Sequence, residues 1–146
     1  MKRFTLYAAG VAFVVSATGC CCLDRPLSLE NTTWELETES IQGIPAETPK
    51  PEQDITISLQ DGKAFGFGGV NRYNTTATIN SEAGKISFGE IASTRMAGPA
   101  LPLESAYFNV LKTVDGYKIA DGKLYFYADG NVVAAFDADD TPSDND

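Results

Sequence analysis

Hydrophobic and polar residues alternate along most of the chain, and this period of two predicts β-strands. Five segments show it before residue 90, and three further apolar segments, 116–120, 123–128 and 131–136, follow after residue 115. The residues that share one face in each early segment are Trp34 and Leu36; Ile55, Ile57 and Leu59; Phe65 and Phe67; Tyr73, Thr75, Ala77 and Ile79; and Ile86 and Phe88.

Asp-Gly pairs mark the turns between several of these segments. They occur at Asp61-Gly62, Asp121-Gly122 and Asp129-Gly130, and Asp-Gly is a strong signal for a two-residue hairpin turn. The first pair predicts a hairpin, and the other two predict a meander of three strands at the end of the domain.

One segment has helical rather than strand periodicity. Its apolar residues fall along a single stripe of a helix over about residues 102–115: Leu103, Tyr107, Val110, Leu111 and Val114. Pro102 suits the first turn, Glu104 complements the positive helix start, and Gly116 is the expected C-terminal cap. The pattern predicts one α-helix inserted before the last three strands.

These elements predict a mainly β protein: a single-domain antiparallel curved sheet or partial barrel of about eight strands that closes over one helix. The interval 41–53 contains three prolines and no periodicity, so we expect a surface loop that serves mainly as a connection. The glycines Gly66 and Gly68 predict a bend in a strand where side chains would block close approach of the backbone.

The N-terminus is typical of a secretory signal. Two basic residues precede an uncharged stretch from Phe4 to Ala17, and all three cysteines of the chain follow at 20–22. The segment "SATGC" resembles the lipobox of bacterial lipoproteins, so we expect a signal peptide at 1–19 and a covalent diacylglycerol on Cys20. Cys21 is an alternative lipidation site, and an ordinary secretory signal cleaved nearby is an alternative reading of the segment.

Composition places limits on partners. The chain has 43% hydrophobic residues and a net charge of −9; without residues 1–19 it has nine basic and twenty acidic residues, a net charge of −11. This charge argues against nucleic acid as a partner, and it means that contact with a membrane has to come from the lipid. We expect a tether at 20–30, the domain at 31–137 and a disordered acidic tail at 138–146.

Several chemistries lack the residues they need. The chain has no histidine and no cysteine after position 22, which excludes a serine–histidine triad and a zinc or iron site with nitrogen and sulfur ligands. Carboxylate pairs such as Glu82 with Glu90 or Glu104 are conceivable but look like a solvated surface. The glycine stretch does not complete a phosphate-binding pattern, because Asn71 stands where the third glycine belongs and a strand follows.

Three motifs occur in a familiar order: "GFGGVNRYN" at 66–74, Thr94-Arg95-Met96-Ala97, and the helix led by Glu104. With the opening "NTTWEL", the sequence from Leu29 to Phe136 resembles the META domain family, which includes HslJ-like bacterial envelope proteins. Members of that family often have cysteines at the positions of Val70 and Gly98. The joint absence of both cysteines here implies that positions 70 and 98 are neighbours in space.

The resemblance implies a small β-rich domain, often lipid-anchored, associated with envelope stress and without an established reaction. We therefore expect no catalytic residue, no metal and no cofactor other than the covalent lipid. The family motifs supply a candidate binding surface, of which Arg72 and Arg95 are expected to pair with Glu90 or Glu104, or else to bind an anion. The candidate residues are Asn71, Arg72, Tyr73, Thr94 and Arg95.

The sequence thus favours a non-catalytic envelope lipoprotein, periplasmic or surface-facing, whose domain contacts an unknown envelope protein or a small ligand. A carrier of a small apolar ligand or lipid inside the curved sheet is the first alternative. A hydrolase that uses two carboxylates in one cleft is the second.

Overall fold

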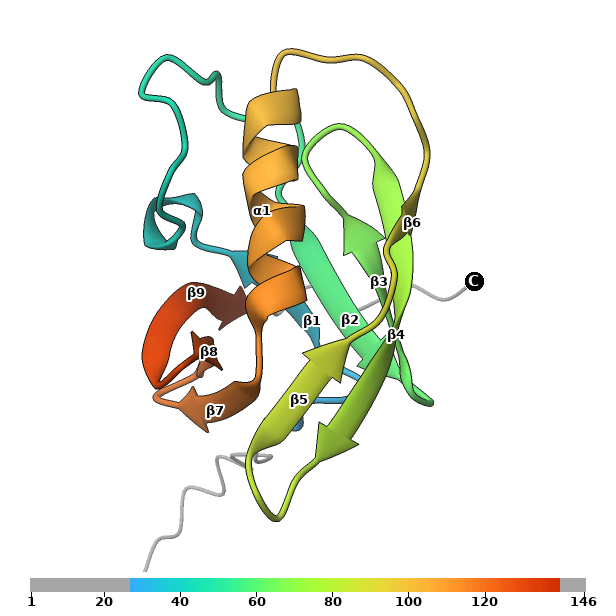
Figure 1. Ribbon diagram of the computed structural model, residues 1–146, viewed down its shortest axis with the longest axis vertical. Helices are drawn as coiled ribbons and strands as arrows, with labels where there is room; N and C mark the ends of the chain where they lie inside the picture. Colours follow the sequence, from blue (N-terminus) through green and yellow to red (C-terminus); the bar gives the residue numbers. More distant parts are fainter. Residues whose placement is uncertain (1–26, 140–146) are drawn as a thin grey trace, which may run out of the picture.

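The computed structural model describes residues 27–139, which fold into one antiparallel sheet and one α-helix (Figure 1). Within these residues the predicted mainly β fold, with its single helix before the last three strands, is confirmed. The strands are β1 (Thr33–Leu36), β2 (Thr56–Gln60), β3 (Lys63–Phe67), β4 (Arg72–Asn80), β5 (Lys85–Phe88), β6 (Ala92–Ser93), β7 (Gly116–Ala120), β8 (Lys123–Ala128) and β9 (Asn131–Ala138). A short 3-10 helix, η1 (Thr38–Ser40), follows β1.

The described residues contain nine strands where the sequence predicts about eight. The additional strand, β6, pairs with Tyr73 and Asn74 of β4, while β5 pairs with residues 77–80 of the same strand. The two short strands therefore lie one after the other along a single edge of β4. The strand β6 has only two residues, Ala92 and Ser93, and both are exposed, so it has no alternation by which the sequence could reveal it.

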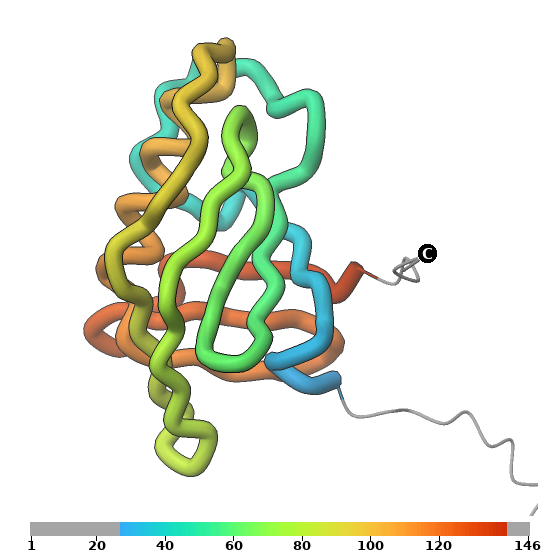
Figure 2. The backbone as a smooth tube through the Cα atoms, turned by 90° about the vertical axis from the view of Figure 1, so that its right-hand side faces the viewer, coloured from blue at the N-terminus to red at the C-terminus, as the bar shows by residue number. Residues whose placement is uncertain are grey.

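The sheet closes into a ring. Its strand order is β3-β2-β1-β9-β8-β7-β5-β4-β6, and β3 also pairs with β4 over five residue pairs. The ring is uneven, because β5 and β7 pair only at Lys85 and Gly116. Figure 2 shows the β7–β9 meander running crosswise behind the β2–β3–β4 strands.

The Asp-Gly turns are confirmed. Asp61, Asp121 and Asp129 all have positive φ angles, between 50° and 54°, and the glycine that follows each of them is also positive. Two consecutive residues with positive φ match the right-handed twist of the strands that they join. These turns fix the registers of β2–β3, β7–β8 and β8–β9.

The helix α1 (Leu101–Thr113) has the predicted Pro102 in its first turn but ends two residues earlier than predicted. The prediction that Gly116 caps it is wrong, because Val114 already has an extended conformation (φ −61°, ψ 128°) and Gly116 begins β7. A Cβ atom on Gly116 would lie 3.2 Å from the Gly84 carbonyl oxygen, so this glycine permits the close approach of β5 and β7.

Large side chains fill the centre of the ring. Trp34, Tyr107, Phe126 and Phe136 are fully buried, and the Phe126 and Phe136 rings meet edge to face with centroids 5.1 Å apart. Tyr107 of α1 packs against the same aromatic pair, since its ring centroid lies 6.3 Å from that of Phe136. The helix is thus held by the same core that closes the ring.

The buried face of β3 differs from the predicted pattern. Phe65 and Phe67 share a face, as predicted, but it is the outer one: Phe65 is 42% exposed, and Ala64 is the buried residue of this strand. The inner face cannot hold a larger chain at Gly66, because a Cβ atom there would lie 2.8 Å from the Thr56 carbonyl carbon. The prediction that the glycine permits a close approach is confirmed.

Residues before the first strand also contact the core. Leu29, which falls within the predicted tether, is buried, and its carbonyl oxygen accepts a hydrogen bond from the Trp34 indole at 3.2 Å. Glu30 also bridges to Leu59. The predicted lipidation site and signal peptide lie outside the described residues, as do residues 140–146 of the predicted tail. Within residues 27–139, no helix has the length and hydropathy to cross a membrane.

Candidate functional site

The predicted motif residues meet at one end of the ring, around the side chain of Asn71. This side chain is 2% exposed and uses both of its polar atoms. Its Oδ1 accepts hydrogen bonds from Thr94 Oγ1 at 2.9 Å and from the backbone N–H of Met96 at 2.7 Å. Its Nδ2 donates to Glu104 Oε1 at 2.8 Å and to the Met96 carbonyl at 3.2 Å.

Glu104 completes this arrangement from the first turn of α1. Its Oε2 accepts hydrogen bonds from the backbone N–H groups of Val70 at 2.9 Å and Asn71 at 2.6 Å. The carboxylate is 4% exposed, and such a buried group needs these donors to offset its lost hydration. We call Asn71, Thr94, Met96 and Glu104, with the backbone of Val70, the Asn71–Glu104 network.

The network joins three segments that are distant in the sequence: the β3–β4 loop, the segment after β6 and the start of α1. Gly69, in the β3–β4 loop, has a φ of +115°, a conformation that favours glycine. The joining of these three segments explains why the three sequence motifs occur together, because each motif supplies one partner of the network. The hydrogen bonds of Glu104 to the β3–β4 loop were not predicted from the sequence, which suggested instead an interaction with the helix dipole, an arginine partner or a carboxylate pair.

The expectation that positions 70 and 98 are neighbours is confirmed. A Cβ atom on Gly98 would lie 3.6 Å from Val70 Cβ and 2.8 Å from its Cγ1. Val70 therefore packs against the backbone of the segment that the Asn71 side chain holds by hydrogen bonds.

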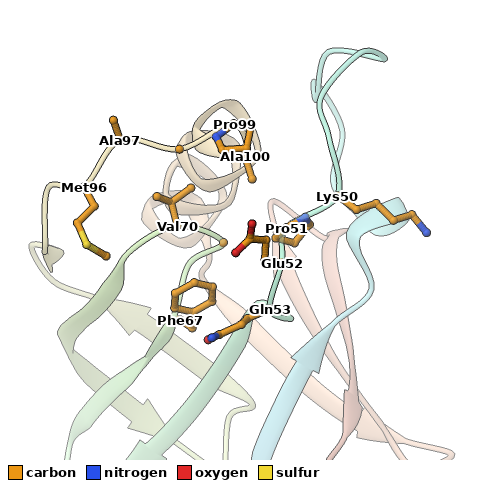
Figure 3. A pocket seen from close by; sticks show the side chains of 12 residues that line it. Lys50, Pro51, Glu52, Gln53, Phe67, Val70, Met96, Ala97, Pro99 and Ala100 are labelled. Atoms are coloured by element: carbon orange, nitrogen blue, oxygen red, sulfur yellow. The ribbon is translucent and has the colours of Figure 1, made fainter.

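A pocket of about 280 Å³ lies between these segments and the end of the long loop before β2 (Figure 3). We call it the apical pocket. Most of its lining is apolar: Pro51, Phe67, Val70, Met96, Ala97, Gly98, Pro99 and Ala100 contribute, together with Lys50, Glu52, Gln53 and Gly69. Met96 stands at its margin and is 61% exposed. The loop 41–53, expected to be a connection, thus contributes one wall of the pocket.

A second set of polar groups lies deeper, beneath the pocket. Tyr73 donates its hydroxyl hydrogen bond to the Thr56 carbonyl at 2.8 Å, and its oxygen lies 2.7 Å from the Tyr107 hydroxyl. Burial raises the pKa of both tyrosines, and for Tyr73 the neighbouring Tyr107 adds to the effect. Both remain neutral hydrogen-bonding groups of the core.

The five predicted binding residues do not form one exposed surface. Asn71 and Tyr73 point into the domain, and Thr94 is held against Asn71. Arg72 and Arg95 are exposed. The structure brings Asn71 and Thr94 together in a saturated network, which gives them a role in positioning the loops around the apical pocket.

The predicted pairing of the arginines is wrong. No ion pair joins Arg72 or Arg95 to Glu90 or Glu104 within residues 27–139, where Lys123 pairs with Glu37 and with Asp137. Glu104 is buried against the β3–β4 loop and is therefore not a partner for an exposed arginine. The carboxylate pair of Glu82 with Glu104, conceivable from the sequence, is not formed either. Glu82 belongs to the β4–β5 turn, which lies at the opposite end of the domain from the first turn of α1 (Figure 1).

The acidic side chains do not form a ligand set for a metal. Within the described part of the chain, no three His, Cys, Asp or Glu side chains are grouped in a way that could hold an ion.

The closed sheet, the single helix and the loop network together define a small single-domain β protein with an apolar pocket at one end. The chain belongs to the META domain family, whose model matches residues 27–140. The resemblance drawn from the sequence motifs is thereby confirmed, and the matched region coincides with the ordered domain.

Two solved structures are similar to this chain. One, described as the NMR structure of the protein from Burkholderia xenovorans, is 28% identical, with a TM-score of 0.58 over 77% of this chain and 84% of that one. The other, described as the NMR structure of the protein, is 16% identical, with a TM-score of 0.54 over 75% of this chain and 94% of that one, and it supports the fold alone. No curated protein matches the sequence.

Proposed function

We propose that this protein is a non-catalytic lipoprotein of the bacterial cell envelope whose META domain is an interaction module that uses the apical pocket. The observation that carries the proposal is the combination of a mostly apolar pocket with a rigid frame. The Asn71–Glu104 network fixes two of its walls, so that the pocket is formed before a partner arrives.

The size of the pocket indicates what it accommodates. A volume of about 280 Å³ is at the lower limit for a small-molecule site and is comparable to one or two large side chains. An exposed methionine at its margin can adapt to different apolar shapes. These properties favour an apolar side chain of a partner protein over a complete lipid.

The centre of the ring supports the same choice. A carrier that holds a ligand inside the curved sheet needs space there, but Trp34, Tyr107, Phe126 and Phe136 occupy it without exposure to solvent. The apical pocket lies outside this core, between loops. A ligand would therefore bind at the end of the domain rather than within the sheet.

Site-specific photo-crosslinking tests the module. A benzophenone amino acid at Met96 is expected to give a discrete crosslinked product in cells, whereas the same residue at Val132, which is also exposed but lies on β9, is not. Ala97→Trp, which places an indole at the pocket, is expected to abolish the Met96 product. Equal products at both positions, or a Met96 product that persists with Ala97→Trp, would contradict the proposal.

The anchor is tested separately, by intact-mass spectrometry of protein extracted from membranes with detergent. A mature chain that begins at Cys20 and carries acyl chains supports a lipoprotein. A mature chain without acyl mass, or one that begins elsewhere, contradicts the anchor but leaves the pocket untouched.

A further inference from the structure

The outer face of the sheet carries a second hollow of about 610 Å³ over β1, β2, β3 and β4, which we call the outer groove. Phe65 and Phe67 of β3 line it together with Glu35 of β1 and with Asp54, which lies just before β2. Arg72 lines it from β4, at the opposite side of the strand order from Glu35. The groove therefore has an aromatic centre and an acidic side.

The aromatic centre is unusual for a sheet face that meets solvent. Phe65 is 42% exposed, and its cross-strand neighbours are the small polar residues Ser58 and Asn74. The side chains of Ser58 and Asn74 are too small to shield the Phe65 ring from solvent. A partner that covers it gains the free energy of removing its apolar surface from water.

Crowded carboxylates make the acidic side. Glu35 lies directly opposite Asp137 across the β1–β9 pair, and such like-charge pairs are unfavourable. Partial loss of hydration raises the pKa of Glu35, and the negative charges of Asp54, Asp139 and Asp137 raise it further. Repulsion between these side chains would fall if a positive charge were placed among them.

Lys123 supplies such a charge to only one part of this surface. It pairs with Glu37 and Asp137, on the β8–β9 side. Within residues 27–139 neither Glu35 nor Asp54 forms an ion pair, although Lys50 borders them from the preceding loop. Glu35 and Asp54 are close enough to hydrogen-bond to each other, and a cation from outside would relieve the repulsion between their charges.

The outer groove and the apical pocket adjoin each other. Gln53 and Phe67 line both of them, so one bound segment can extend from the loop end of the domain onto the face of β3. The two sites together offer apolar surface at two positions and negative charge beside the second. This combination specifies the chemistry of the partner more closely than the apical pocket alone.

We propose that the outer groove binds a basic, apolar segment of the partner protein, with an aliphatic or aromatic side chain on Phe65 and a lysine or arginine beside Glu35 and Asp54. The proposal rests on the interaction module proposed above and names the chemistry of its partner. A second copy of this chain does not match the groove, because the net charge of the chain is −9. The same negative charge argues against anionic lipid surfaces and nucleic acids as partners of the groove.

Fluorescence anisotropy with synthetic peptides tests the proposal. The protein is the mature chain purified in detergent, the probe is a labelled peptide in which three lysines alternate with three phenylalanines, and empty micelles give the background. Two matched peptides replace every lysine by glutamate or every phenylalanine by serine. Tight binding is expected for the first peptide alone, with an affinity that falls as salt is added.

Charge variants locate the site. The double variant Glu35→Gln/Asp54→Asn is expected to weaken binding of the lysine peptide about five- to tenfold, as expected for the loss of two exposed charge pairs. The control variant Glu47→Gln/Glu82→Gln removes two exposed charges outside the groove and is expected to leave the affinity unchanged. Phe65→Ser is expected to weaken binding without changing its salt dependence.

Each contrary outcome is distinct. Equal binding of the lysine and glutamate peptides, or equal loss in the two double variants, overturns the basic-partner proposal. Concentration-dependent dimerisation in sedimentation, abolished by Glu35→Gln/Asp54→Asn, overturns it in favour of a second copy. If the Met96 crosslink still depends on Ala97, the interaction module survives either result; if that crosslink is also absent, the proposed function fails with it.

Discussion

Tyr107 and Tyr73 share a hydrogen bond of 2.7 Å between their hydroxyl oxygens in the fully buried centre of the domain. Since the Tyr73 hydroxyl donates to the Thr56 carbonyl, Tyr107 is the donor to Tyr73. The pair joins α1 to β4 and β2 through a chain of two hydrogen bonds. Because of this direction, removal of the two hydroxyl groups has unequal effects on stability.

Tyr73→Phe is expected to destabilise the domain more than Tyr107→Phe. The first change leaves both the Tyr107 donor and the Thr56 carbonyl without this partner, whereas the second removes one donor only. We expect a loss of about 1 kcal/mol for Tyr107→Phe and about 2–3 kcal/mol for Tyr73→Phe, measured by urea unfolding. Equal losses would show that the assigned direction of the hydrogen bond is wrong.

The same pair predicts sensitivity to alkali. Both tyrosines have a pKa above the ordinary value of 10.0 in the folded chain. The unfolded chain therefore loses these protons first, and the free energy of unfolding falls as the pH rises above 10.0. Unfolding midpoints measured on both sides of this pH test the prediction, and Tyr107→Phe is expected to show a smaller decline than the parent protein.

Glu104→Gln is expected to loosen the Asn71–Glu104 network. An amide keeps one acceptor oxygen, but its NH₂ group cannot accept the hydrogen bonds that the second carboxylate oxygen receives. We expect the free energy of unfolding to fall by about 1.5–3 kcal/mol, the usual cost for hydrogen bonds to a buried charge. Glu82→Gln, on an exposed turn, is the matched control and is expected to change it by less than about 0.5 kcal/mol. Similar losses in the free energy of unfolding for Glu104→Gln and Glu82→Gln would show that the network does not stabilise the fold.

Val70→Cys/Gly98→Cys is expected to form a disulfide without rearrangement. The distance of 3.6 Å between the two Cβ positions falls within the range found in disulfides. Oxidation of the double variant, made with Cys21 and Cys22 changed to serine, is expected to raise stability by about 2–4 kcal/mol relative to the reduced form. Mass spectrometry and unfolding with and without reductant give the answer, and a pair that stays reduced in air would contradict the geometry.

Glu35→Gln is expected to stabilise the domain slightly at neutral pH. The folded-state pKa of Glu35 is raised, so protonation relieves repulsion from Asp54, Asp139 and Asp137. The gain of the variant over the parent is therefore present at pH 7 and disappears as the pH falls below the ordinary glutamate value of 4.5. Thermal unfolding at several pH values measures it; a gain that does not depend on pH would have another cause.

Local signals in the sequence predicted the elements well. The Asp-Gly pairs carry their turn geometry in two adjacent residues, and the alternation of Ile55, Ile57 and Leu59 follows directly from one buried face. The contact between Val70 and Gly98 followed from the family resemblance. Each of these inferences needed only a short segment or a matched pair of positions.

Long-range contacts were the part that the sequence could not supply. The hydrogen bonds of Glu104 cross 33 and 34 residues, and no local pattern distinguishes a buried glutamate at a helix start from an exposed one. The face of Phe65 depends on how β3 joins β4 to close the ring, which alternation alone does not determine. The candidate site was predicted as a set of residues, but their burial decided which of them can meet a partner.

The position where the chain enters the domain has a consequence for the proposed lipid anchor. The described chain begins, in blue, in the lower half of the domain, and the β3–β4 loop and the segment before α1, which line the apical pocket, lie at the top (Figure 2). If Cys20 carries the lipid, the six residues between it and residue 27, which make seven Cα–Cα steps, span at most about 25 Å. The membrane would then lie within this distance of the point where the chain enters the domain, and the apical pocket, at the other end, would remain accessible to a soluble or neighbouring envelope protein.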